Sequence, residues 1–148
     1  MIDRANAGEI TDEQARQLVE KAREARQKAY VPYSHFPVGA AVLTGSGRVF
    51  TGCNVENAAY GPTICAERTA VVKAVSEGER EIVAIAVVAD TEGPCSPCGI
   101  CRQVISEFGK EIRVVMANLA GAIRVKTIGE LLPSTFDADQ LYSSGERG

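Results

Sequence analysis

Apolar residues recur at helical spacing near the start of the chain. Thr11 and Gln14 fit a capping box, in which each side chain bonds the other residue's backbone amide. Apolar positions then recur every three or four residues up to Ala29, with charged residues between them. Pro32 interrupts this pattern because proline removes a helical hydrogen-bond donor. The sequence therefore predicts an amphipathic helix that runs from its cap to about Tyr30.

Short apolar runs and longer periodic segments alternate through the rest of the chain. Residues 38–43 and 48–53 are typical of a hairpin around a Gly-Ser-Gly turn, and the β-branched run 82–89 is typical of a central strand. Three more helices and two more strands are expected, over residues 66–77, 99–108 and 127–132, and over 113–117 and 121–126. This order of elements predicts an α/β fold, a three-layer α-β-α sandwich around a mixed five-stranded sheet.

Length and composition fit one globular domain over residues 1–148, with residues 1–10 and 137–148 expected to be loosely ordered. Hydrophobic residues make up 45% of the chain, which is enough for a core. The net charge of −3 does not favour nucleic acid as a partner. No apolar run is long enough for a membrane span, and the N-terminus lacks the apolar core of a signal peptide. We therefore expect a cytoplasmic protein.

Three of the five cysteines are spaced as metal ligands. Cys98 and Cys101 are three residues apart at the expected start of a helix, so both sulfurs point to one spot, and Cys65 precedes another helical segment. Three thiolates suit Zn²⁺, which takes four ligands, and a free fourth position allows water to be activated. Glu67 is near enough to Cys65 to exchange protons at such a site. The pattern predicts a catalytic zinc centre.

Other interpretations of these residues remain open. The cysteines could be small buried apolar side chains, as isolated cysteines often are. A closed structural zinc site would need a fourth ligand, for which Cys95 is the main candidate, followed by His35 and Cys53. A closed site would leave no position for water, and the chain would then be a small zinc-binding interaction module.

Several longer motifs occur in the order found in one enzyme family. They are Tyr33-Ser34-His35-Phe36-Pro37-Val38-Gly39-Ala40-Ala41, Gly52-Cys53-Asn54-Val55-Glu56-Asn57-Ala58-Ala59-Tyr60, Cys65-Ala66-Glu67-Arg68-Thr69-Ala70, Ser96-Pro97-Cys98-Gly99-Ile100-Cys101-Arg102-Gln103, and Glu130-Leu131-Leu132-Pro133 followed by Phe136. Together they cover most of the chain. With these motifs the sequence resembles the cytidine deaminases of the small, homotetrameric type with three zinc-binding cysteines.

The resemblance implies a fold, a reaction and a cofactor. It implies a cytidine deaminase-like sandwich and hydrolysis of cytidine and deoxycytidine to uridine and deoxyuridine with release of ammonia, a step of pyrimidine salvage. One zinc ion per subunit would be held by Cys65, Cys98 and Cys101, with Glu67 as the catalytic acid and base. A homotetramer that binds a small nucleoside, and neither nucleic acid nor membrane, is expected.

The resemblance also implies which residues surround the nucleoside. Phe36 would stack on the base, Asn54 and Glu56 would bind the sugar, and the backbone of Ala66 would contact the base. Neighbouring subunits would contribute Ala58, Tyr60 and Phe136, while Arg68 would hydrogen-bond the ligand thiolates and Gln103 would support the site without contacting the substrate. From the sequence alone, Phe36 also fits a core position, Asn54 a turn, Glu56 a solvated surface, and Arg68 a surface salt bridge.

Two related activities are the main rivals. A deaminase of another cytosine compound, such as a nucleoside antibiotic, would share the metal chemistry and differ in the loop over residues 54–60. A deaminase that edits nucleic acid would need a basic or aromatic path for flanking nucleotides. The chain has 16 basic residues against 19 acidic ones and no tryptophan, so this second rival is disfavoured.

Overall fold

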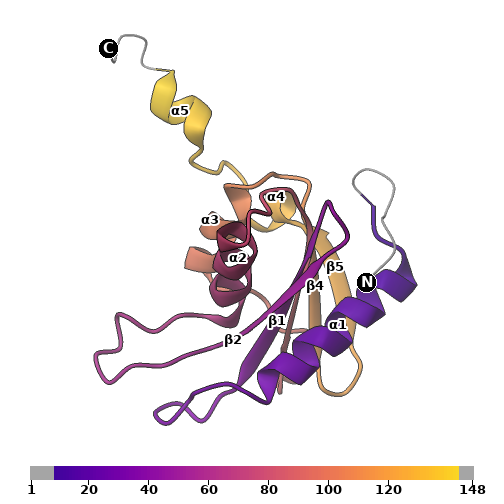
Figure 1. Cartoon of the computed structure of the whole chain (residues 1–148), viewed down its shortest axis with the longest axis vertical. Helices are drawn as coiled ribbons and strands as arrows, with labels where there is room; N and C mark the ends of the chain where they lie inside the picture. The colour runs from indigo at the N-terminus through magenta and orange to yellow at the C-terminus, as the bar shows by residue number, and fades with distance from the viewer. Residues whose placement is uncertain (1–8, 144–148) are drawn as a thin grey trace.

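Five strands form one mixed sheet in the order β2-β1-β3-β4-β5 in the computed structural model, which describes residues 9–143 (Figure 1). β1 is antiparallel to both β2 and β3, β3 is parallel to β4, and β4 is antiparallel to β5. The strands are β1 Val38–Thr44, β2 Val49–Cys53, β3 Ile82–Ala89, β4 Arg113–Asn118 and β5 Ile123–Thr127. The predicted mixed five-stranded sheet is confirmed.

Helices cover both faces of this sheet. Helix α1, Asp12–Arg26, lies on one face, and α2, Ala66–Ser76, α3, Gly99–Ser106, and α4, Ile128–Leu131, lie on the other (Figure 1). Strand β1 shows how one strand serves both layers, because Ala40 and Val42 belong to the core under α2 whereas Ala41 and Leu43 belong to the core under α1. Two apolar cores therefore separate three layers, as predicted.

Helix α1 begins as the sequence predicts and ends earlier. Its capping box is present: the Thr11 side chain accepts from the backbone of Gln14, and the Gln14 side chain accepts from Thr11. The helix ends at Arg26, four residues before the predicted end at Tyr30. Tyr30 instead pairs with the segment after β2, donating to Asn54 O and accepting from the Glu56 amide. This tertiary pairing overrides the helical periodicity.

Helix α2 packs against β2 at a glycine. A Cβ atom on Gly52 would lie 2.5 Å from the backbone nitrogen of Ala70 and 2.6 Å from the carbonyl oxygen of Ala66. Real side chains do not tolerate such distances, so only glycine lets the helix approach the strand this closely. The contact fixes the first turn of α2, which carries Cys65 and Glu67 at its start.

The C-terminal part differs from the prediction in two places. Strand β5 begins at Ile123 and not at residue 121, because Gly121 has a positive φ of 97° in the turn before it. Helix α5, Ala138–Tyr142, occupies part of the stretch expected to be loosely ordered, and it projects away from the sandwich (Figure 1). Asp137 caps it by accepting from the Gln140 amide.

Two predictions remain, one on the ends of the chain and one on membrane spans. The loose order expected for residues 1–8 and 144–148 falls outside the described residues. Within residues 9–143, no helix combines the length and the apolar character needed to cross a lipid bilayer.

Candidate active site

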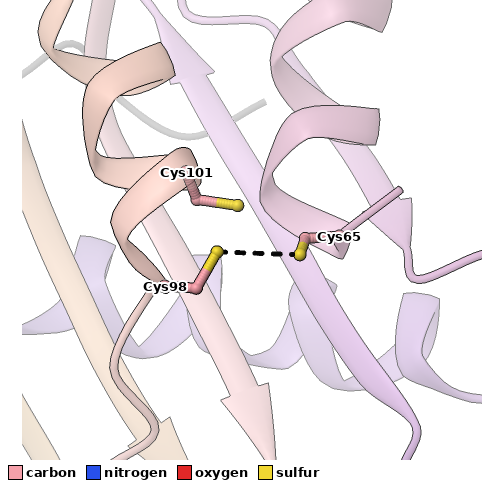
Figure 2. Close-up of side chains that lie close together, drawn as sticks. All are labelled: Cys65, Cys98 and Cys101. Atoms are coloured by element: carbon pink, nitrogen blue, oxygen red, sulfur yellow. Dashed lines mark hydrogen bonds between the residues drawn. The ribbon is translucent and has the colours of Figure 1, made fainter. Parts of the chain in front are cut away.

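Three cysteine sulfurs converge at the N-terminal ends of two neighbouring helices. Cys65 is the N-cap of α2, Cys98 is the N-cap of α3, and Cys101 lies in the first turn of α3. Figure 2 shows the side chains of Cys98 and Cys101 pointing from one helix toward Cys65 on the other. The predicted placement of Cys98 and Cys101 in the first turn of a helix is confirmed.

The distances between the sulfurs fit one zinc ion. All three Sγ atoms lie within 4.8 Å of one another, and those of Cys65 and Cys98 are 3.8 Å apart. Zinc binds thiolate sulfur at about 2.3 Å, so two sulfurs at corners of a tetrahedron around it lie about 3.8 Å apart. The three thiols are free and not joined in disulfides. The donor set and its spacing therefore suit a single Zn²⁺.

The electrostatic environment favours a negative charge on one sulfur of this cluster, that of Cys65. The pKa of Cys65 is lowered to about 5, first because the Cys101 thiol hydrogen-bonds its sulfur and also because Arg68 does. The Nη2 atom of Arg68 lies 3.4 Å from Cys65 Sγ, the kind of contact expected for Arg68, and it also donates to Thr63 O at 3.3 Å. Two helix N-termini, each with a partial positive charge, also face the sulfurs. A metal cation would further stabilise the thiolates.

Glu67 is almost completely buried beside the same sulfurs. It is 4% exposed and lies in the first turn of α2, two residues after Cys65. Burial raises the pKa of its carboxyl, and a hydrogen bond with the Cys101 thiol opposes this shift in part. A raised pKa makes the carboxylate a stronger proton acceptor than an exposed glutamate is. Glu67 is thus a buried carboxyl with a raised pKa directly beside the three sulfurs.

No fourth residue joins the cluster in the part of the chain that the structure describes. Among histidines, cysteines and carboxylates of residues 9–143, the ligand atoms of Cys65, Cys98 and Cys101 form the one group with metal-binding spacing. Cys95 packs instead against the core between the sheet and α2, where burial raises its pKa to about 11. Its placement argues against the closed four-cysteine site. Cys98 is exposed, so the cluster opens toward solvent.

Three of the predicted nucleoside-binding residues meet at one turn. Phe36 lies before β1 and is 40% exposed, so it is not the core phenylalanine that its hydrophobicity alone would suggest. The side chain of Asn54, directly after β2, donates to Phe36 O and accepts from the Val38 amide, both at 2.9 Å. Glu56 accepts hydrogen bonds from the turn that precedes Phe36. These contacts exclude a freely solvated Glu56.

The other predicted residues are spread between the surface and the interior. Ala58 and Tyr60 are exposed, and the Tyr60 ring meets Tyr33 edge-on at 6.1 Å between centroids. Phe136 is 59% exposed, and its carbonyl accepts from Gln103 Nε2 at 3.0 Å. The Gln103 side chain thus bonds the C-terminal segment, and its supporting role at the site stays a prediction. Ala66 is fully buried at the start of α2.

Two further residues contact the site and are absent from the sequence predictions. Ser34 bonds both Glu56 and Phe36, although nothing in the local pattern separates it from an ordinary turn serine. Arg102 donates from Nε to Pro97 O at 2.9 Å and from Nη1 to Leu131 O at 2.7 Å. Its position next to Cys101 in the sequence was the available signal.

Comparison with known proteins agrees with this geometry. Residues 12–118 match the family model described as the cytidine and deoxycytidylate deaminase zinc-binding region. A cytidine deaminase of Sporosarcina psychrophila is 53% identical over 131 residues, which are 88% of this chain and 96% of that protein. One from Halalkalibacterium halodurans is 54% identical over 125 residues, covering 84% and 95%.

A solved structure supports the same relationship. The crystal structure of cytidine deaminase from Burkholderia pseudomallei superimposes with a TM-score of 0.81 at 52% identity, covering 86% of this chain and 100% of that one. The residues that match the family model run from α1 to β4 and include Cys65, Cys98 and Cys101. The chain belongs to the zinc-binding cytidine and deoxycytidylate deaminase family.

Proposed function

We propose that the protein is a cytidine deaminase that hydrolyses cytidine and deoxycytidine to uridine and deoxyuridine and releases ammonia. The observation that carries this proposal is the combination of three convergent sulfurs with a buried carboxyl, Glu67, on the same helix turn as Cys65. Family membership and relatives named cytidine deaminase support the substrate. The reaction would serve pyrimidine salvage.

Each residue of the centre has a distinct task in this proposal. Cys65, Cys98 and Cys101 hold one zinc ion per subunit, which when bound supplies a Lewis acid that lowers the pKa of water. Glu67 would take one proton from that water and give it to N3 of the pyrimidine as the oxygen adds to C4. It would then carry the second proton of this oxygen to the amino group as the C4–N bond breaks, which leaves a carbonyl at C4 and releases ammonia. Arg68 offsets the negative charge of three thiolates.

Recognition of the nucleoside is assigned to the turn and loop beside β1 and β2. Phe36 offers an exposed aromatic face for stacking on the base, and the backbone of Ala66 contacts the base edge. Asn54 and Glu56 offer hydrogen-bonding groups to the sugar hydroxyls. Contacts across subunits suit three exposed residues, which are Tyr60, Ala58 two residues before it, and Phe136.

Assembly and location are part of the same proposal. We expect a homotetramer in which neighbouring subunits complete each pocket, measured as a mass of about four times 15.7 kDa by light scattering. A monomer with full activity would contradict this assembly. The five free cysteines of the chain suit a reducing compartment and support a cytoplasmic location.

The decisive experiment removes the proton carrier and leaves the metal ligands intact. Glu67→Gln should keep zinc and lose about 10²- to 10⁴-fold in turnover of cytidine, followed by the change in ultraviolet absorbance. Cys98→Ala should lose both zinc and activity. Glu77→Gln, at the exposed C-terminal end of the same helix, is the matched control and should behave as the parent. Full activity of Glu67→Gln would refute the proposed mechanism.

A further inference from the structure

The backbone of Phe36 is held on both sides by side chains. Its amide donates to Ser34 Oγ at 3.1 Å, and its carbonyl accepts from Asn54 Nδ2 at 2.9 Å. The Ser34 hydroxyl in turn donates to Glu56 Oε2. Glu56 and Asn54 thus restrain Phe36 from opposite ends, Glu56 acting through Ser34.

Glu56 holds the rest of this turn with its second oxygen. Its Oε1 atom accepts from the amides of Tyr33 at 3.1 Å and of Ser34 at 3.0 Å. These bonds lower the pKa of Glu56, first through the Ser34 hydroxyl, and keep the carboxylate charged. Hydrogen bonds to a charged acceptor are stronger than those between neutral groups. The turn is therefore held by one carboxylate together with a backbone bond from the His35 amide to Val31 O at 3.0 Å.

The turn needs this restraint because its backbone is strained. His35, between Ser34 and Phe36, has a φ of 54°, a left-handed conformation that costs a residue with a Cβ atom free energy. Phe36 follows immediately, so relaxation of His35 would rotate the whole Phe36 residue. An exposed ring has few packing contacts that would keep it in place, and Phe36 is 40% exposed.

We propose that Ser34 is a positioning residue: its hydroxyl joins the Glu56 carboxylate to the Phe36 amide and thereby fixes the ring that stacks on the base. Glu56 then has a second role besides the sugar contact, as the anchor of this relay. The inference rests on the proposed function, since it assigns Phe36 to the nucleoside. Ser34 acts through Phe36 and needs no contact with substrate.

The kinetic consequence follows from where the stacking contact is made. A stacked ring contributes equally to substrate and transition state, so its misplacement raises KM and leaves kcat unchanged. Loss of one hydrogen bond in the relay should raise KM for cytidine about 3- to 10-fold in Ser34→Ala. Ser34→Thr keeps the hydroxyl and should restore most of this loss.

A double-mutant cycle with Phe36 separates this role from a general structural one. In a Phe36→Ala background, Ser34→Ala should change KM by less than about 1.5-fold, because the ring it positions is gone. Ser46→Ala is the matched control. Ser46 lies in the turn between β1 and β2, and its Oγ atom also donates to a carboxylate, that of Glu79, at 2.6 Å. This control should keep the KM of the parent.

The outcomes distinguish this inference from the proposed function. The expected result is the rise in KM for Ser34→Ala with kcat preserved, and its disappearance without Phe36. An unchanged KM, or equal losses with and without the Phe36 ring, would overturn the role of Ser34 while parental turnover of cytidine upholds the proposed function. A parent chain that does not deaminate cytidine would refute the proposed function and this inference with it.

Discussion

Gly52→Ala tests whether the close contact between β2 and α2 determines the geometry of the metal site. The added Cβ atom would lie 2.5 Å and 2.6 Å from two backbone atoms of α2, which belong to Ala70 and Ala66. Restoring an ordinary contact of 3.4 Å requires α2 to retreat by about 0.9 Å, the larger of the two shortfalls. Backbone atoms cannot rotate away as a flexible side chain would, so the whole helix must move.

The displacement should reduce both stability and function. Overpacking of this kind costs about 1–3 kcal/mol, and we expect the upper end because both obstructing atoms are backbone. Cys65 and Glu67 move with α2, whereas Cys98 and Cys101 stay with α3. Zinc affinity should therefore fall, and a misplacement approaching 1 Å should reduce turnover about 100-fold.

Two assays and one control variant complete this test. Urea unfolding of the zinc-loaded protein gives the loss of stability, and competition with a chromophoric chelator gives the zinc affinity. Gly93→Ala is the control, because no atom lies within 4 Å of its added Cβ and its φ is unstrained. If Gly52→Ala matched this control in stability and zinc affinity, the contact would not fix the position of α2.

Three further predictions use other features of the chain. His35→Val should lower the free energy of unfolding by about 1–2 kcal/mol and His35→Gly should not, because only glycine adopts a φ of 54° without strain; urea titration compares them. Chelation of zinc should lower the melting temperature, and an unchanged value would exclude metal-linked stability. The hydrogen bond from Lys110 is the largest cause that holds the pKa of the Asp137 carboxyl below 3.8, and the Gln140 amide is the next. The contribution of this pair to folding stability is therefore present above pH 3.8 and is lost as the pH falls through the lowered pKa. Lys110→Met should move the Asp137 titration, followed by NMR, back toward 3.8.

The elements that the sequence predicts best are those determined by local patterns. The strand over residues 82–89 is found with the predicted bounds, since a continuous β-branched run buried on both faces has few alternatives. The capping box at Thr11 is also present. Where distant segments compete, local patterns fail: Tyr30 leaves the helical pattern to pair with the backbone after β2.

The metal centre was predictable, and the contacts of the residues assigned to the nucleoside were less so. Ligand spacing along a helix is a local property, so Cys98 and Cys101 follow from the sequence, whereas the approach of Cys65 depends on how α2 packs against β2. The bonds of Asn54 and Glu56 to the turn before β1 span 16 to 23 residues, and no periodicity encodes such contacts. Helix α5 was missed although Asp137 and Gln140 carry a capping signal.

The division between helix ends and loops has a consequence for how this scaffold can change. The sulfurs and Glu67 are mounted on the starts of α2 and α3, whereas Phe36, Asn54 and Glu56 belong to irregular segments tied mainly to each other. Those two segments form a unit, and the backbone of Val55 pairs with Ile64 directly before Cys65, so the backbone of the unit also holds the entry to α2. On the proposed assignment of these residues, selectivity for a different nucleoside would evolve, or be engineered, by changing the side chains of this unit while its backbone, the three cysteines and Glu67 stay as they are.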